Sequence, residues 1–445
     1  MNEKYIVSGD HVLTMNDKMD VIKNGAVVIQ GKKIIEVGDA AMLFKKYPGA
    51  KTIGGKGHVV MPGLINTHNH APMVYLRGIS NDLPLKQWLE SYIWPIENKF
   101  LCPEYVSDAT DLACIEMLRS GTTTYADMYF YCDEMAKASK KIGIRAMLGE
   151  TGFDFPTTAV KSLDEYFKRA EKFIIDWRND DLIIPSIAPH APYTCSTDTL
   201  KKAGWLAKKH GIPIQIHVAE TEWEINEIQS KYGKRPISYL DSIGFLDNNV
   251  IAAHCVFADA EDIKILAERQ VSVAHCIESN LKLASGFAPI PEMLETGVKI
   301  GFGTDGAASN NDLNMFGEIS TVAKVHKAVK KDPTVMDAKT VLLLATKGGA
   351  KALGINNLGY LAPNCLADVI TLDFYKPHLL PMYDVYSHLV YAATGSDVAN
   401  VLVNGRVLMQ NGVLSCCNVD RILAKANLWY KKITAKNPHK LTLTN

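Results

Sequence analysis

Residues 58–70 read HVVMPGLINTHNH, an apolar run that ends in a pair of histidines. Seven further short apolar runs follow, and longer helix-like stretches such as 160–177 and 198–211 separate them. Strand-like runs that alternate with helical patterns indicate βα units around a parallel sheet. Eight such units predict an α/β fold, a (β/α)8 TIM-like barrel over residues 61–364. The other seven runs are residues 121–128, 143–150, 182–190, 212–220, 249–255, 271–276 and 298–305.

Both ends of the chain carry short strand-like runs separated by turn signals. They fill the first sixty residues and return between residues 366 and 414, where the hairpin dipeptide Asn-Gly occurs at 404 and at 411. Neither end alone has enough strands for a sandwich. We therefore expect one small β-sandwich domain built from residues 1–60 and 365–445. The alternative is a set of hairpins that merely decorate the barrel.

Composition and charge exclude several classes of protein. The 445 residues include 48 Lys plus Arg and 48 Asp plus Glu, so the net charge is zero and nucleic acid is not an expected partner. No apolar run reaches about 18 residues, and the N-terminus lacks a signal-peptide pattern, so no membrane association is expected. The nine cysteines are scattered and have no CxxC spacing, which indicates reduced thiols and not a disulfide framework. These features predict a soluble cytoplasmic protein.

Histidine or aspartate stands at the end of most strand-like runs. Barrel enzymes carry their chemistry at the C-terminal ends of the strands, where the following loops form the mouth. One such histidine is commonly a core residue, but five separate strands that end in histidine indicate a shared site. The residues concerned are His68, His70, Asp127, His190, His217, His254, His275 and Asp305.

The first histidine pair has the spacing of metal ligands on a strand. Because residues i and i+2 of an extended strand point to the same face, His68 and His70 can reach one ion while Asn69 points away. His217 and Asp305 would complete a set of nitrogen and oxygen ligands. Such a set suits Zn²⁺ or another borderline divalent cation.

The motifs PGLINTHNH, IHVAETE, AAHC, AHCIESNLKL and GFGTDG occur in the order that is typical of the amidohydrolase superfamily. The chain resembles that superfamily over essentially its whole length. Three segments are most similar to the branch that deaminates 5'-methylthioadenosine and S-adenosylhomocysteine. They are LRGISNDLPLKQWLESYIWPIE (76–97), GTTTYADMYF (121–130) and APHAPYTCS (188–196).

The resemblance implies a reaction and a cofactor. The expected reaction is hydrolytic deamination of a 5'-modified adenosine to the inosine analogue and ammonia, by water that a metal ion activates. No strand-end lysine matches the carboxylated bridge of two-metal relatives, so one divalent ion per chain, Zn²⁺, is expected. The implied ligands are His68, His70, His217 and Asp305. By analogy with relatives, the chain is expected to form a homo-oligomer, a dimer or a tetramer.

The resemblance also implies roles for individual side chains. Glu220 would carry a proton from water to the ring, His254 would orient the water, and Asp305 would relay a proton to the leaving amine. The residues implied to contact the nucleoside are Trp88 and Glu97 on the sugar, His190, Glu220 and Asp305.

Other interpretations stay open at this point. Trp88 could be a core aromatic residue and Glu97 a solvated helix residue. A related deaminase of 6-aminodeoxyfutalosine, guanine, pterin or a triazine would share the metal set. Guanine, pterin and triazine sites need no carboxylate for a sugar diol, so Glu97 discriminates against them. A non-catalytic assembly protein on the same scaffold would lose metal ligands, which this chain retains.

Two departures from the superfamily pattern bear on the substrate. Ile277 stands where proline is common, so the seventh loop is expected to differ locally. The third strand ends in Glu150, with no lysine or arginine before Lys161. A negative charge there would repel a carboxylate-bearing tail, which predicts small or neutral 5'-groups. His275 either lines the site or caps its strand, and Asp127 is given no catalytic role.

Overall fold

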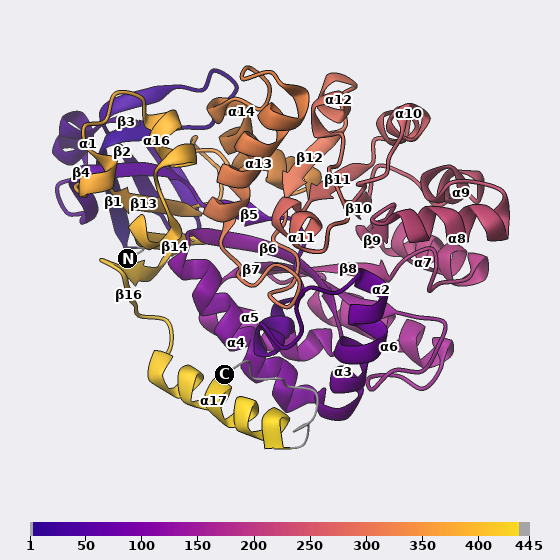
Figure 1. The fold of residues 1–445 in the computed structure, drawn as a ribbon. Coiled ribbons are helices and arrows are strands. Elements are labelled where there is room, and N and C mark those ends of the chain that lie inside the picture. Colours follow the sequence, from indigo (N-terminus) through magenta and orange to yellow (C-terminus); the bar gives the residue numbers. More distant parts are fainter. Residues whose placement is uncertain (1–2, 436–445) are drawn as a thin grey trace.

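The computed structural model describes residues 3–435, and its central feature is a parallel sheet of eight strands (Figure 1). The strand order is β12-β11-β10-β9-β8-β7-β6-β5, and the Thr67 N–H donates to the Phe302 carbonyl at 2.8 Å across the remaining gap. The (β/α)8 barrel predicted from the sequence is therefore confirmed. Its strands are β5 (Leu64–Asn66), β6 (Thr122–Tyr129), β7 (Arg145–Gly152), β8 (Ile183–Pro189), β9 (Ile214–Val218), β10 (Val250–His254), β11 (Ser272–His275) and β12 (Lys299–Phe302).

Helices follow the barrel strands and cover the outside of the sheet (Figure 1). Local sequence defines their ends: the Ser196 hydroxyl caps the start of α7, and Gly211 ends α7 in the left-handed conformation. The helices of this layer are α4 (Pro103–Arg119), α5 (Cys132–Ile142), α6 (Leu163–Trp177), α7 (Thr197–His210), α8 (Glu222–Tyr232), α9 (Pro236–Ser242), α10 (Ala260–Glu268), α11 (Ile277–Lys282), α12 (Ile290–Glu295), α13 (Met315–Lys330), α14 (Ala338–Leu343), η3 (Leu344–Gly348) and α15 (Gly349–Ala352).

A second sheet of eight strands combines both ends of the chain. Strand β13 pairs antiparallel with β4, which joins the C-terminal strands to the N-terminal ones. The prediction that the two ends build one β unit is confirmed. The strand order is β16-β15-β14-β13-β4-β1-β2-β3. The bounds are β1 (Lys4–Leu13), β2 (Val21–Gln30), β3 (Lys33–Asp39), β4 (Lys51–Pro62), β13 (Val369–Asp373), β14 (Val398–Val403), β15 (Arg406–Gln410) and β16 (Val413–Leu414), with α1 (Ala40–Lys46), η4 (Pro377–Leu379), α16 (Val385–Tyr391) and η5 (Gly395–Asp397) in the connections.

The run 58–70, expected as one strand, passes through both sheets. Its first part ends β4 at Pro62 in the end sheet, and β5 begins at Leu64 in the barrel. Gly63 lies at the crossing, where a Cβ atom would come within 2.1 Å of the Thr123 hydroxyl oxygen. The absence of a side chain at residue 63 lets the chain pass this close to β6.

The last described helix, α17 (Val419–Ala435), leaves the end sheet and lies along α4 of the barrel (Figure 1). The Trp429 indole N–H donates to Asp108 of α4 at 3.2 Å, and Lys425 pairs with the same carboxylate. Residues 1–2 and 436–445 of the predicted end domain lie outside the described residues. Within residues 3–435, no helix combines the length and the apolar character needed to cross a membrane.

Candidate active site

Five of the strand-end residues singled out in the sequence line one cavity at the C-terminal ends of the barrel strands, and His68 packs directly against them. The ring of His68 is buried and packs edge-on against the rings of His70 and His217, with centroids 4.9 Å from each. The cavity also has a wall of aromatic and aliphatic side chains. Its lining includes the predicted residues His70, Trp88, Glu97, His190, His217, Glu220, His254 and Asp305, together with Met73, Leu85, Leu89, Trp94, Met128, Tyr129, Phe130, Thr151, Phe153, Tyr193, Leu283 and Ser309.

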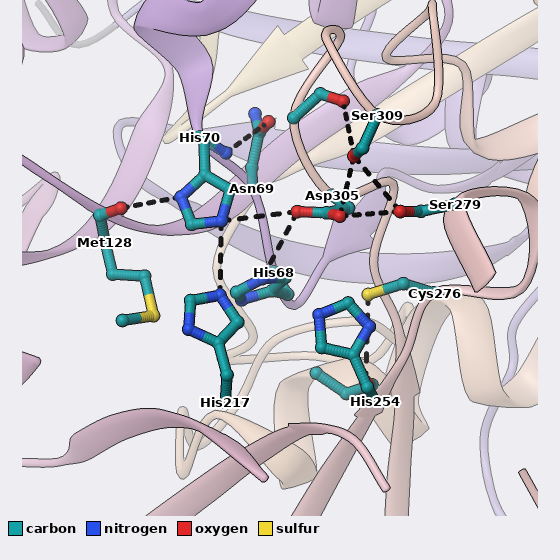
Figure 2. A network of polar contacts seen from close by, with 12 residues as sticks. His68, Asn69, His70, Met128, His217, His254, Cys276, Ser279, Asp305 and Ser309 are labelled. Carbon is teal, nitrogen blue, oxygen red and sulfur yellow. Dashed lines mark hydrogen bonds and ion pairs between the residues drawn. The ribbon is translucent and has the colours of Figure 1, made fainter. Parts of the chain in front are cut away.

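Asp305 presents one carboxylate oxygen to the histidines (Figure 2). Oδ1 lies 3.2 Å from His70 Nε2 and 3.5 Å from His68 Nε2. The hydroxyls of Ser279 and Ser309 both donate to Oδ2 at 2.7 Å. The two serines thus fix the carboxylate orientation. Sequence reasoning missed them, although Ser279 belongs to the AHCIESN motif and Ser309 stands four residues after Asp305.

The hydrogen bonds of two histidines determine which ring nitrogen faces the centre. His70 Nδ1 lies 2.7 Å from the Met128 carbonyl, and His217 Nδ1 lies 2.8 Å from the His190 carbonyl. A carbonyl only accepts, so both Nδ1 atoms carry the hydrogen and the Nε2 atoms of the neutral rings present lone pairs. These two Nε2 atoms are 3.3 Å apart. Two facing acceptors at this distance repel each other unless a bound cation or a proton on one of the rings lies between them.

Other features of the cluster also fit a divalent cation. His68 Nε2 is buried without a hydrogen-bond partner, and burial lowers the pKa of His68 to about 4, which keeps the imidazole neutral as a ligand must be. Burial alone would lower the pKa of His70, but the hydrogen bond to Asp305 raises it to about 9. The position among these atoms therefore attracts positive charge. Ligand atoms of His68, His70 and Asp305 lie within 4.8 Å of one another, as do those of His68, His217 and His254.

Glu220, on the loop after β9, and His254, the last residue of β10, lie beside this cluster. Glu220 Oε2 is 3.9 Å from His254 Nε2, and burial raises the pKa of Glu220. The other nitrogen of the His254 ring, Nδ1, lies 2.9 Å from the Asn280 amide oxygen. A buried carboxyl group with a raised pKa, next to an oriented imidazole, is suited to proton transfer.

Trp88 and Glu97 come from a helical segment that folds over the cavity. The segment consists of α2 (Leu85–Trp88), the π-helical turn η2 (Leu89–Ile93) and α3 (Trp94–Phe100). Both side chains are buried, so the interpretation of Glu97 as a solvated helix residue is wrong. Burial raises the pKa of Glu97 to about 7, and the Tyr129 hydroxyl donates to its Oε1.

His190 directly follows β8 and lies next to His217 of β9, with ring centroids 4.8 Å apart. Its ring stacks on Phe153 with centroids 4.4 Å apart, and its Nδ1 lies 2.9 Å from the Thr194 hydroxyl. Burial lowers the pKa of His190 to about 3, so the ring is neutral near pH 7. A neutral imidazole at this position can exchange hydrogen bonds with an uncharged ring or sugar.

The structure contradicts the role that the sequence suggested for Glu150. Its side chain lies between the strand and the helix layer, where it accepts from the N–H groups of Tyr131 (3.3 Å) and Cys132 (3.0 Å). Arg169 of α6 also donates to it at 3.2 Å. Glu150 does not line the cavity, and its charge is compensated, so the prediction that it repels a carboxylate-bearing substrate tail is wrong.

Two further strand-end residues, His275 and Asp127, contact other buried residues and do not line the cavity. His275 is buried with its Nε2 3.2 Å from His326 Nε2 of α13 and does not line the cavity. Asp127 is buried and accepts from the Ala71 N–H at 2.6 Å, which fixes the backbone just after His70. Ile277 is the first residue of α11 and is buried.

Comparisons with known proteins agree with this geometry. The family model described as "Amidohydrolase family" matches residues 59–408. A 5-methylthioadenosine/S-adenosylhomocysteine deaminase of Thermodesulfovibrio yellowstonii is 48% identical over 97% of this chain and 99% of that protein. A 5'-deoxyadenosine deaminase of Methanosarcina acetivorans is 44% identical over 97% and 98%. The crystal structure of an adenosine deaminase from Xanthomonas campestris with bound zinc matches with a TM-score of 0.95 and 38% identity, over 97% and 98% of the two chains.

Proposed function

This chain belongs to the amidohydrolase family, and from that premise we propose that it hydrolytically deaminates a 5'-modified adenosine to the inosine analogue and ammonia. One observation carries the proposal: the buried carboxylate of Glu97 shares a cavity with the cluster of histidines and Asp305. The first can hold a sugar and the second can hold the cation that hydrolysis needs. The names of the relatives at 44% and 48% identity support the same reaction.

His68, His70, His217 and Asp305 would hold one divalent ion, and we propose Zn²⁺. When bound, such an ion lowers the pKa of water from 15.7 towards roughly 7 and so makes a nucleophile available at neutral pH. The convergent nitrogen and oxygen atoms support this assignment, as does the zinc in the Xanthomonas campestris deaminase.

The protein side chains would then move the protons. Glu220 accepts a proton from the attacking water and delivers it to N1 of the purine, so that the ring can accommodate addition at C6. His254, whose Nδ1 is fixed by Asn280, hydrogen-bonds the water through Nε2. Asp305 takes the proton of the hydroxyl group added at C6 and passes it to the amino group, so that the C6–N bond breaks, ammonia leaves and the C6 carbonyl forms.

The part of the cavity that would bind the sugar accounts for the preference for nucleosides. The Glu97 carboxylate accepts hydrogen bonds from the 2'- and 3'-hydroxyls, while Trp88 and His190 contact the bound nucleoside. Guanine, pterins and triazines lack a diol, so they would leave Glu97 as a buried carboxylate without partners beyond Tyr129. Because Glu150 lies outside the cavity, it gives no reason to exclude 5'-groups that carry a carboxylate.

The direct test is a panel of substrates given to the zinc-loaded protein. The panel contains 5'-methylthioadenosine, S-adenosylhomocysteine, 5'-deoxyadenosine, adenosine, 6-aminodeoxyfutalosine and guanine. Ammonia release and the ultraviolet shift from adenine to hypoxanthine report the reaction. We expect turnover of 5'-modified adenosines and none of guanine. Activity on guanine alone would overturn the proposal while leaving the cation site in place.

Two further predictions concern the whole molecule. A homo-oligomer, either a dimer or a tetramer, and a cytoplasmic location both stay predictions. Sedimentation of the purified protein measures the first, and fractionation of cells measures the second.

A further inference from the structure

The backbone that presents Glu220 has an unusual conformation. Ala219, between the last residue of β9 and Glu220, has a φ of +53°. This left-handed region suits glycine, whereas an L-residue with a Cβ atom is disfavoured there. A fully buried alanine adopts it only where surrounding contacts hold it in place.

Those contacts come from Glu224, in the first turn of α8. Its side chain is completely buried. Oε1 accepts from the Ala219 N–H at 2.8 Å, and Oε2 accepts from the Glu220 N–H at 2.9 Å. The Thr221 hydroxyl caps α8 by accepting from the Glu224 N–H at 3.2 Å. In an ordinary capping box, a glutamate at this position reaches the N–H of the capping residue itself. Here it reaches past Thr221 to the end of the strand.

The neighbouring carbonyls are fixed from the other side. The Cys255 N–H donates to the Val218 carbonyl at 3.0 Å, and the Phe257 N–H donates to the Ala219 carbonyl at 2.9 Å. Both donors belong to the loop that follows β10, the strand that ends at His254. Glu224 therefore supplies the remaining constraint on the turn, through the two N–H groups. Only a carboxylate provides both acceptors, because an amide has one oxygen and its NH₂ group would face an N–H.

We propose that Glu224 is a positioning residue. It holds Ala219 in the left-handed conformation, and this directs the Glu220 carboxylate into the cavity beside His254. Glu224 does not itself line the cavity. The inference rests on the proposed function for the role of Glu220, whereas the conformational claim is independent of the reaction.

The test uses Glu224→Gln, Ala219→Gly and the double variant. In Glu224→Gln we expect kcat to fall by about 100-fold, because a small misplacement of a reacting group reduces the rate by about this factor. KM and zinc content should stay near wild type, because Glu97 and the histidine cluster are untouched. Ala219→Gly alone should keep most of the activity. The double variant should recover much of the lost kcat, because glycine adopts a positive φ without help from Glu224.

A matched control exists at the opposite end of the barrel. Asp180 accepts from two successive backbone N–H groups, those of Leu182 (2.9 Å) and Ile183 (3.2 Å), where β8 begins. Both N–H groups donate to the same oxygen, Oδ1, and Oδ2 pairs with Lys140. Asp180→Ala removes these bonds, so it should lower the thermal stability and leave kcat unchanged. If Glu224→Gln does not fold, Glu224→Asp, which is one methylene too short to reach both N–H groups, takes its place.

Two results would overturn the positioning role: wild-type kcat in Glu224→Gln, or a double variant no faster than Glu224→Gln. Failure of the proposed function has a different signature, namely a wild-type protein that deaminates no adenosine. Crystal structures of the wild type and of Glu224→Gln then still decide the inference. If Glu224 is a positioning residue, then in Glu224→Gln residue 219 leaves the left-handed region or the Glu220 carboxylate turns away from His254.

Discussion

The two ends of the barrel use the left-handed backbone conformation in opposite ways. At the base, the chain reaches several strands through glycines with positive φ: Gly121 (84°), Gly143 (103°), Gly211 (65°) and Gly297 (84°). At the mouth, residues with side chains adopt it: Ala219 (53°), His254 (72°), Cys255 (49°) and Asp305 (60°). Glycine has no steric penalty there, whereas other residues lose about 1–2 kcal/mol each. The base thus uses glycine before four of its strands, with Gln270 (55°) before β11 as an exception, whereas the mouth accepts strain where a particular side chain is needed.

The two ends also treat buried charge differently. Near the base, Arg145 donates to both oxygens of Asp368 at 3.1 Å, so two buried charges neutralise each other. At the mouth, Glu97, Glu220 and Asp305 are buried without such a partner of opposite charge among the described arginines and lysines. Charges that a fold leaves uncompensated are available to a cation or a substrate. The mouth of the barrel thus sacrifices stability for chemistry, whereas the base does not.

Removal of the cation should have the largest effect. Dialysis against a chelator is expected to abolish deamination, and added Zn²⁺ should restore it, because water is then again activated at neutral pH. Metal analysis and ammonia release, measured on the same samples, check the outcome. Full activity in protein without metal would refute the proposal that the histidines and Asp305 hold an ion that the reaction needs.

The next largest effect is expected from Glu220→Gln. The amide keeps the shape of the side chain but cannot accept a proton and return it, so kcat should fall by about 10²–10⁴-fold while zinc content stays unchanged. Glu222→Gln, at an exposed position two residues further on, is the matched control and should behave as wild type. Turnover of Glu220→Gln within a few-fold of the control would refute the proton-transfer role.

A smaller effect, with a pH dependence, is expected at Glu97. Burial raises the pKa of Glu97 to about 7, so the carboxyl group is protonated below that pH and ionised above it. Only the ionised form accepts hydrogen bonds from both sugar hydroxyls through charged oxygens. KM should therefore rise as the pH falls below about 7. In Glu97→Gln, KM should be about tenfold or more above wild type, as loss of a charged hydrogen bond implies, and independent of pH in this range. A wild-type KM that is flat between pH 6 and pH 8 would contradict the assignment.

The smallest effect is expected at the base. Gly211 follows α7 with a φ of +65° and open space around its Cβ position. Gly211→Ala should lower the free energy of unfolding by about 1–2 kcal/mol through the left-handed penalty alone and leave kcat unchanged. Chemical denaturation and steady-state kinetics measure both quantities. A loss of activity at this position would show that the two ends are not functionally separate.

Much of the fold and of the site could be predicted because their signals are local. Alternating strand and helix patterns predicted the barrel, and strand-end histidines predicted the cluster, since residues that end parallel strands meet at one edge of a sheet. The spacing of His68 and His70 already placed both imidazoles on one face. The resemblance of residues 76–97 to a known family added Trp88 and Glu97, which no periodicity distinguishes from core or solvated helix residues.

The remaining features depend on contacts between distant segments. The sequence placed Glu150 and His190 alike at strand ends, but Glu150 lies two residues before the end of β7 and points to the helix layer, whereas His190 directly follows β8 and lines the cavity. The register of the closed sheet decides which of these side chains face inward. Ser279 of α11 reaches Asp305 and Ser309, which share the loop after β12, only when these two distant segments come together. The sequence thus determined which chemical groups stand at the ends of the strands. The tertiary structure decided which of them face one another, because hydrogen bonds between loops, and not local propensity, orient the side chains at the mouth.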